Sequence, residues 1–216
     1  MSGYLQTKKK VTVNTLKSRK SEAKKLSMVT CYDASFAQLI NKTDIDMVLV
    51  GDSLANVMMG LEDTVSVKME HMIHHTKCVS SKLKHPFLIA DMPFMSYNIS
   101  LEQAMTNAAA LVQEGRANAV KLEGGIEICP QVKALVDAGI PVVGHLGLTP
   151  QSINTMGGYK VQGRGEEERR KLLDDAKALE KAGACALVLE VVPKDLAKEV
   201  SELINIPTIG LSLIHI

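Results

Sequence analysis

Short apolar runs alternate along the chain with longer segments whose apolar residues recur at helical spacing. Each run is nearly continuous in aliphatic residues, which is typical of parallel strands buried on both faces of a sheet. Seven runs predict strands at residues 28–32, 46–51, 87–90, 119–122, 141–144, 186–189 and 207–210.

The segments between these runs carry the start and stop signals of helices. Ser100 and Gln103 form a capping box at the start of one helical pattern. Helices are predicted over residues 100–114, 127–138 and 166–182, and they are expected to stop at Gly115, Gly139 and Gly183. The order helix, glycine, strand therefore recurs, which indicates successive βα units in a parallel sheet.

Charged side chains at nearly every strand end decide between two parallel architectures. A doubly wound sheet gathers its site at one switch point, whereas a barrel collects one residue from each of several strands. We therefore predict an α/β fold of the (β/α)8 TIM-barrel type. The barrel is expected to be incomplete, because seven strands are counted where a closed barrel has eight.

Composition narrows the class of protein. The 216-residue chain is 46% hydrophobic, which suits one α/β domain with a sizeable core, and its net charge of +1 favours neither nucleic acid nor membrane as a partner. Residues 1–26 are interpreted as a basic N-terminal segment and residues 27–210 as the barrel domain. No apolar run has the features of a secretory signal or approaches the ~20 residues needed to span a bilayer.

The cysteines indicate a reducing compartment. Cys31, Cys78, Cys129 and Cys185 lie far apart and form no Cys-x-x-Cys pair. This spacing argues against a disulfide framework or a zinc site, and it is typical of reduced thiols. We therefore expect a cytoplasmic protein.

Two aspartates directly follow predicted strands. Asp52 follows the run at 46–51, and Asp91 follows the run at 87–90. Neighbouring carboxylates at a barrel rim suit Mg²⁺, which is commonly held by one or two carboxylates together with waters and substrate oxygens. The alternative is that each aspartate caps the following helix or turn. The further charged strand ends beside them favour the metal interpretation.

Lys121 and Glu123 lie two positions apart in a predicted strand, so they are expected to point to the same face. Two charges facing a barrel interior are costly unless they are paired or bound to something. A structural ion pair is one interpretation. Beside a metal, Lys121 is expected to bind a carboxylate or enolate oxygen and Glu123 to hold a metal-bound water. His145 directly follows the next predicted strand.

Glu190 closes the apolar run Ala186–Leu189. A carboxylate among apolar residues is suited to act as a general base near neutral pH, because desolvation disfavours its charged form. The alternative is a cap on the next helix, but Pro193 already starts that helix. We therefore predict that Glu190 is a general base.

Two other features are interpreted as structural. His71 and His75 are one helical turn apart beside His74, but interleaved apolar residues indicate an ordinary packed helix. The glycine-rich segment 157–165 lacks the strand–Gly-x-Gly-x-x-Gly–helix context of a dinucleotide fold. We expect it to be a loop over the rim of the barrel.

Six ordered motifs resemble the ketopantoate hydroxymethyltransferase family. They are the segments 31–34, 50–54, 90–94, 120–125, 144–152 and 157–163, and the resemblance extends from Thr12 to Gly210. It implies a Mg²⁺-dependent barrel that transfers a hydroxymethyl group from 5,10-methylenetetrahydrofolate to 3-methyl-2-oxobutanoate, giving 2-dehydropantoate (ketopantoate) in pantothenate biosynthesis. It also implies small-molecule partners, a 2-oxo acid and a folate, and a homo-oligomer, specifically a decamer.

The resemblance also implies roles for individual residues. Mg²⁺ binding is implied for Asp52 and Asp91, with Glu123 close to the metal through water. Substrate binding is implied for Asp52, Ser53, Asp91, Lys121 and His145. Glu190 matches the base that removes the C3 proton of the oxo acid.

The C-terminus departs from the family pattern. Residues 211–216 resemble nothing in the family, so the chain is expected to be truncated and to carry an unrelated tail. Seven strands leave two sheet edges with unpaired backbone groups. We therefore expect the 216-residue chain to be less stable and more prone to aggregation than one extended with a family-like C-terminus.

Two other functions compete with the transferase. A Mg²⁺-dependent carbon–carbon lyase of the phosphoenolpyruvate mutase and isocitrate lyase type shares the barrel and the acidic metal ligands. Such lyases usually carry a catalytic cysteine in a Lys-Lys-Cys-Gly-His-type loop, and none of the four cysteines here has that setting. The other alternative is an inactive fragment or a partner-binding subunit, which an assay for ketopantoate would distinguish.

Overall fold

The computed structural model describes residues 8–158 and 160–211. Its strands are β1 (Met28–Thr30), β2 (Met47–Val50), β3 (Phe87–Asp91), β4 (Ala119–Glu123), β5 (Val142–Gly147), β6 (Ala186–Glu190) and β7 (Thr208–Leu211). Its α-helices are α1 (Val13–Ser21), α2 (Ala34–Ile40), α3 (Leu54–Met59), α4 (Met69–Ser80), α5 (Leu101–Gln113), α6 (Cys129–Asp137), α7 (Ile153–Met156), α8 (Glu166–Ala182) and α9 (Lys194–Leu203). Short 3₁₀ helices cover Ile126–Ile128 and Pro150–Ser152.

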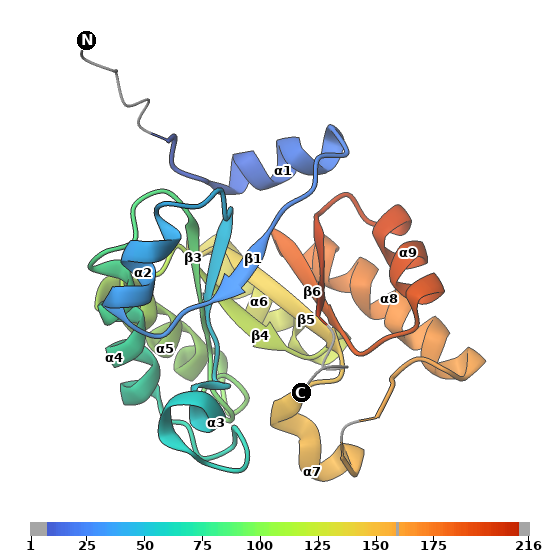
Figure 1. Cartoon of the computed structure of the whole chain (residues 1–216). Coiled ribbons are helices and arrows are strands. Elements are labelled where there is room, and N and C mark those ends of the chain that lie inside the picture. The colour runs from blue at the N-terminus through green and yellow to red at the C-terminus, as the bar shows by residue number, and fades with distance from the viewer. Residues whose placement is uncertain (1–7, 159, 212–216) are drawn as a thin grey trace.

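The described strands form one parallel sheet of seven strands in the order β1 to β7. The sheet curls into a nearly closed barrel, with helices around its outer face (Figure 1). Within the described residues, β1 and β7 are the two edge strands of the sheet. The predicted fold, an incomplete (β/α)8 barrel with seven strands, is confirmed.

The strands that carry the charged ends, β3 to β6, end later than the sequence predicts, whereas β1 and β2 end earlier, at Thr30 and Val50 instead of residues 32 and 51. The prediction that β5 ends at Gly144 is wrong, because parallel pairing continues to Gly147, which lies opposite Glu190 of β6. Likewise β3, β4 and β6 each run one residue further, so that Asp91, Glu123 and Glu190 are the last residues of their strands. The charged residues are therefore held by the sheet itself rather than by the loops that follow it.

Two of the expected helix boundaries also differ. The helix predicted from residue 127 begins at Cys129, since Pro130 fits only the first turn and residues 126–128 form a 3₁₀ turn instead. Gly115 is not a left-handed cap, because the positive φ of 63° lies at Arg116. A side chain at Gly115 would come within 2.6 Å of the Leu111 carbonyl oxygen, so the glycine allows a close backbone approach. Gly183 ends α8 in the expected left-handed conformation, with φ 104°.

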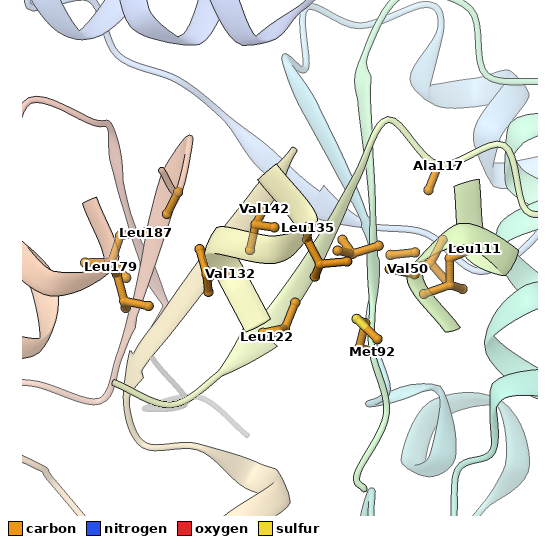
Figure 2. Packing of buried hydrophobic residues seen from close by; sticks show 14 of the residues in the cluster. Val50, Met92, Leu111, Ala117, Leu122, Val132, Leu135, Val142, Leu179 and Leu187 are labelled. Carbon is orange, nitrogen blue, oxygen red and sulfur yellow. The ribbon is translucent and has the colours of Figure 1, made fainter. Parts of the chain in front are cut away.

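The barrel has two apolar clusters, one on each face of the sheet. The outer cluster packs the sheet against α5, α6 and α8, and Leu111, Leu135 and Leu179 are three of its fully buried members (Figure 2). The inner cluster fills the amino-terminal half of the barrel. It consists of Val11, Leu16, Met47, Leu49, Phe87, Ile89, Ala119, Val143, Cys185, Ala186 and Val188.

Helix α1 covers the amino-terminal end of the barrel, opposite α3 and α7 (Figure 1). Its Leu16 is fully buried in the inner cluster. This helix belongs to the described part of the basic segment 1–26, of which residues 1–7 lie outside the described residues. Of the expected tail 211–216, Leu211 is the last residue of β7 and residues 212–216 lie outside the described residues.

Two further observations concern the rest of the chain. No helix among residues 8–158 and 160–211 has the length and apolar character needed to cross a membrane. All four cysteines are free thiols, and Cys31 and Cys185 are buried.

The burial of Leu16 leads to a stability prediction. Leu16→Ala is expected to destabilise the protein by about 2–5 kcal/mol, because the truncated side chain leaves a cavity at the closed end of the barrel. Leu39→Ala is the matched control, since Leu39 is 54% exposed on α2 and exposed positions cost about 0.5 kcal/mol or less. Chemical denaturation measures both, and equal losses would contradict the assignment of α1 as a barrel cover.

Candidate active site

The alternation of side chains along each strand places a polar layer above the inner apolar cluster. In β3, Phe87 and Ile89 face the barrel interior, so Asp91 faces it as well. The same period of two continues the inward faces of β4, β5 and β6 into polar residues at their carboxyl ends. These residues are Lys121, Glu123, His145 and Glu190, all of them buried, and Asp52 is buried just beyond β2.

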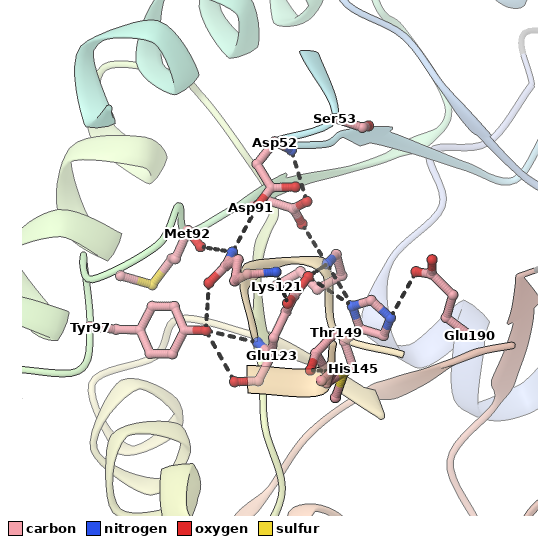
Figure 3. Close-up of polar contacts among 12 residues, drawn as sticks. Asp52, Ser53, Asp91, Met92, Tyr97, Lys121, Glu123, His145, Thr149 and Glu190 are labelled. Carbon is pink, nitrogen blue, oxygen red and sulfur yellow. Dashed lines mark hydrogen bonds and ion pairs between the residues drawn. The ribbon is translucent and has the colours of Figure 1, made fainter. Parts of the chain in front are cut away.

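Lys121 lies at the centre of the polar layer (Figure 3). Its Nζ is 3.1 Å from Asp91 Oδ1, 3.7 Å from Glu123 Oε1 and 3.2 Å from His145 Nδ1. Burial alone would lower the pKa of Lys121, but the carboxylates of Asp91 and Glu123 outweigh it and raise the pKa. The ammonium is therefore charged, and the ion pair considered as one interpretation of Lys121 is present.

His145 connects two carboxylates from neighbouring strands. Its Nδ1 is 3.2 Å from Glu123 Oε1, and its Nε2 is 3.1 Å from Glu190 Oε2 (Figure 3). Burial and the charge of Lys121 act to lower the pKa of His145. The hydrogen bond and the charge of Glu123, together with the close Glu190 carboxylate, outweigh them and raise that pKa above its ordinary value. The imidazole is thus fixed at both nitrogens, which orients the Glu190 carboxylate within the barrel.

Glu190 does not cap a helix. Helix α9 begins at Lys194 after Pro193, with no side-chain cap, and the Glu190 side chain contacts His145 instead. Val188, two positions earlier on the same inward face, is buried in the inner cluster. The carboxylate therefore lies at the inner rim of the barrel, where the His145 imidazole is its one side-chain partner within the part of the chain that the structure describes, an arrangement suited to accepting a proton.

Asp52 and Asp91 lie side by side at the ends of β2 and β3. The Asp52 backbone N–H donates to Asp91 Oδ2 at 3.0 Å, and a side chain at Gly51 would come within 2.9 Å of Ser53 Oγ. The alternative of Asp52 as a helix cap is wrong, because the N-cap of α3 is Ser53 and no side chain caps that helix. Glycine at position 51 therefore permits the tight turn that brings the two carboxylates together.

The electrostatics of this carboxylate pair fit a divalent cation. Burial raises the pKa of Asp52 to about 8, and the charges of Asp91 and Glu123 add to that shift. Burial also raises the pKa of Asp91, despite the opposing charge of Lys121. Glu123 is the exception: burial acts to raise its pKa, but the hydrogen bond to His145, the charges of His145 and Lys121, and the Gln151 N–H together outweigh burial and lower that pKa. A hard cation would compensate the excess negative charge of Asp52 and Asp91.

No set of three or more His, Cys, Asp or Glu side chains in the described part of the chain is arranged as a ready-made metal site. This agrees with the way that Mg²⁺ binds in enzymes, where one or two carboxylates act together with waters and substrate oxygens. Both oxygens of Glu123 contact protein donors, Oε1 at His145 and Oε2 at the Gln151 backbone N–H. Both oxygens of Asp91 also contact protein donors, Oδ1 at Lys121 Nζ and Oδ2 at the Asp52 backbone N–H. Among the contacts of the described residues, Asp52 differs from both, because only its Oδ2 is engaged, by Gln151.

The sequence comparison decides the family. Residues 10–212 match the family model described as Ketopantoate hydroxymethyltransferase. The chain is 59% identical over 202 residues to the 3-methyl-2-oxobutanoate hydroxymethyltransferase of Thermoanaerobacter sp. (strain X514), covering 94% of this chain and 74% of the relative. The chain belongs to the ketopantoate hydroxymethyltransferase family. The enzyme of the same name from Clostridium novyi (strain NT) is 54% identical with the same coverage, and every residue of the site lies inside the matched range.

Solved structures of enzymes with other names share the fold of this chain. A phosphonopyruvate hydrolase, solved with oxalate and Mg²⁺, matches with a TM-score of 0.64 at 14% identity, covering 93% of this chain and 81% of that chain. A 2,3-dimethylmalate lyase of the phosphoenolpyruvate mutase/isocitrate lyase superfamily matches with a TM-score of 0.65 at 18% identity, covering 92% and 70%. At these identities the likeness concerns the fold alone.

Three residues in the site of this family member were not assigned from the sequence. Tyr32 meets the half-buried Ser53 through an O···O contact of 2.8 Å. Tyr97 and Gln151 are buried and contact Glu123, and Gln151 also contacts Asp52. Gln151 was visible only as part of the motif 144–152, and Tyr97 had no signal except its place in the loop after Asp91.

The features interpreted as structural lie elsewhere. The three histidines belong to α4, where each makes a different contact: His71 with the Lys68 backbone N–H, His74 with Cys78, and His75 with the Tyr32 backbone oxygen. In the glycine-rich segment, the Gln162 N–H donates to the Val191 carbonyl oxygen, just after β6. This places the described part of that segment at the rim of the barrel, as expected.

The raised pKa of Asp52 leads to a prediction about pH and stability. The unfolded carboxyl titrates near about 3.9, whereas the folded one titrates at about 8. Between these values the folded state holds a proton that the unfolded chain releases, so stability contributed by protonated Asp52 is lost as pH rises toward about 8.

We therefore expect metal-free protein to lose thermal stability between about pH 5 and 8, and Asp52→Asn to lose less over the same range. Thermal unfolding in the presence of a chelator measures both slopes. The exposed Asp137→Asn is the matched control and is expected to keep the wild-type slope. Identical slopes for wild type and Asp52→Asn would contradict the prediction.

Proposed function

We propose that this protein transfers a hydroxymethyl group from 5,10-methylenetetrahydrofolate to 3-methyl-2-oxobutanoate, giving 2-dehydropantoate (ketopantoate) in pantothenate biosynthesis. The observation that carries this proposal is the continuous series of contacts from Asp91 through Lys121 and His145 to Glu190, buried inside the barrel of a family member. It combines a carboxylate pair for a cation, an ammonium for an anionic oxygen, and a carboxylate for a proton.

In this proposal Asp52 and Asp91 hold Mg²⁺, and Glu123 lies near it through a water molecule. The carboxylate pair supports this assignment because it is buried with excess negative charge. When bound, Mg²⁺ supplies the positive charge that polarises the oxo acid and makes its C3 proton more acidic. Ser53, Lys121 and His145 line the place for the substrate.

Glu190 is the proposed base. Its carboxylate takes the proton from C3 of the oxo acid, and His145 Nε2, 3.1 Å away, keeps the accepting group in place. Lys121 stabilises the negative charge that develops on the oxygen of the enolate. Water would add to the methylene carbon of the folate as both carbon–nitrogen bonds of that carbon break, and tetrahydrofolate would leave with the protons on its nitrogens. C3 would then form the new carbon–carbon bond to the released one-carbon unit at the oxidation level of formaldehyde, whose oxygen, from water, would take up a proton and become the hydroxyl of the product.

The cellular location and the oligomeric state belong to the same proposal. We propose a cytoplasmic location, which the four free thiols support. We also propose a homo-oligomer, a decamer, on the resemblance to the family.

A direct assay tests the proposed reaction. The 216-residue protein is incubated with 3-methyl-2-oxobutanoate, 5,10-methylenetetrahydrofolate and Mg²⁺, and ketopantoate is followed by chromatography. Ketopantoate that forms only when all three are present would support the proposal. No product from folded protein would favour an inactive or partner-binding chain instead. In a parallel incubation with Mg²⁺ and a longer 2-hydroxy acid in place of these substrates, cleavage of that acid would favour a lyase.

The metal assignment leads to a prediction for the two aspartates. Asp91→Asn is expected to keep the fold, because it conserves the shape of the side chain, and to weaken Mg²⁺ binding and turnover by about tenfold or more. Asp52→Asn is expected to act in the same way. Calorimetric titration with Mg²⁺ measures the affinity, and the exposed Asp174→Asn is the matched control. Wild-type affinity in both site variants would remove the assignment.

The assignment of the base leads to a separate prediction. Glu190→Gln is expected to bind oxo acid and Mg²⁺ normally but to exchange the C3 proton at least about 100-fold more slowly, because the amide keeps the shape and loses the basicity. NMR in D₂O follows the exchange without the folate. Glu202→Gln, exposed on α9, is the control. Exchange at the wild-type rate in Glu190→Gln would show that another group is the base.

A further inference from the structure

Gln151 has more contacts with the carboxylates of the site than its position in a loop suggests. It lies in the 3₁₀ turn Pro150–Ser152 that follows β5, and it is buried. Its side chain reaches across to Asp52, which is 99 positions earlier in the sequence. Its backbone N–H contacts Glu123.

The hydrogen bonds of the Gln151 amide determine its orientation. Nε2 donates to Asp52 Oδ2 at 2.8 Å and to the Met92 carbonyl oxygen at 2.9 Å, while Oε1 faces the Tyr97 hydroxyl at 2.9 Å. The Met92 carbonyl oxygen only accepts hydrogen bonds, and so does the Asp52 carboxylate in its ionised form, the form that would bind a cation. A flipped amide would place an oxygen against two other oxygens, so this orientation is the stable one.

The same residue holds an oxygen of each of two carboxylates. Its side chain engages Oδ2 of Asp52, and its backbone N–H donates to Oε2 of Glu123 at 3.0 Å. Asp52 follows β2 and Glu123 ends β4, so these carboxylates come from strands that are not neighbours in the sheet. With Oδ2 of Asp52 occupied, Oδ1 is the oxygen left for a further ligand.

We propose that Gln151 is a positioning residue for Mg²⁺, which acts by fixing the carboxylate of Asp52 and, through its backbone, that of Glu123. This inference rests on the proposed function, since it concerns the same cation site. Gln151 does not itself touch the cation or the substrate. Partners of this kind, in contact with metal ligands, typically change metal affinity or activity by about 10- to 100-fold when they are replaced.

Two variants and one matched control test the proposal. Gln151→Met conserves the length of the side chain and removes its hydrogen bonds, and Gln151→Asn keeps the amide but withdraws it from Asp52. Gln131→Met is the control, because the Gln131 amide donates to the Tyr97 backbone oxygen at 3.3 Å and belongs to the same part of the fold without touching Asp52 or Glu123. Calorimetry measures Mg²⁺ affinity in the presence of 3-methyl-2-oxobutanoate, and thermal unfolding measures stability separately.

We expect both Gln151 variants to bind Mg²⁺ about 10- to 100-fold more weakly, with Gln131→Met close to the wild type. Wild-type affinity in folded Gln151 variants, even with a lowered unfolding temperature, would overturn the proposal and leave the proposed function intact. The same loss of affinity in Gln131→Met would also overturn it, since the effect would then be general. Absence of Mg²⁺ binding by the wild-type protein would overturn the proposed cation site itself.

Discussion

The structure depends on the mutual neutralisation of charges buried inside the barrel. Four strands and one strand–helix turn bring four carboxylates, one ammonium and one imidazole to the same end, all almost completely buried. Each charge is costly to bury alone, and the cost is tolerable only because Lys121 and His145 lie between the carboxylates. The balance is incomplete at Asp52, whose pKa is raised to about 8, and this remaining imbalance is what a cation would correct.

The apolar half of the barrel provides the rigid packing that keeps these buried charges close enough to neutralise one another. The inward faces of its strands are apolar in the amino-terminal half, where Leu16 of α1 and Phe87 of β3 pack together in the inner cluster. These faces become polar only toward the carboxyl ends of the strands, at residues such as Asp91 and Glu190. Apolar packing below the polar layer holds the strands at fixed distances, so that contacts of about 3 Å form between side chains of different strands.

The barrel fold is shared more widely than membership of the family. Enzymes with 14–18% identity share the barrel with TM-scores of 0.64–0.65, so very different sequences satisfy the requirements of the apolar half. Relatives named 3-methyl-2-oxobutanoate hydroxymethyltransferase share 54–59% identity, and the motifs at the strand ends lie within the matched residues. The fold is thus the frame that positions the polar layer, on which the proposed chemistry depends.

The sequence by itself determined the strands, their parallel arrangement and the side chains that face the barrel, because these follow from local periodicity and from the position of each charge in an apolar run. It also indicated Asp52, Asp91, Lys121, Glu123, His145 and Glu190 as a set. It did not indicate that β5 continues to Gly147, since that depends on pairing with Glu190 of the neighbouring strand. Nor did it single out Gln151 or Tyr97, because their roles arise from contacts across long separations, such as the 99 positions between Gln151 and Asp52. The curvature of the sheet into a barrel decides which of these polar groups come into contact. Hydrogen bonds between distant loops produce no periodic pattern in the sequence, so only the tertiary structure reveals them.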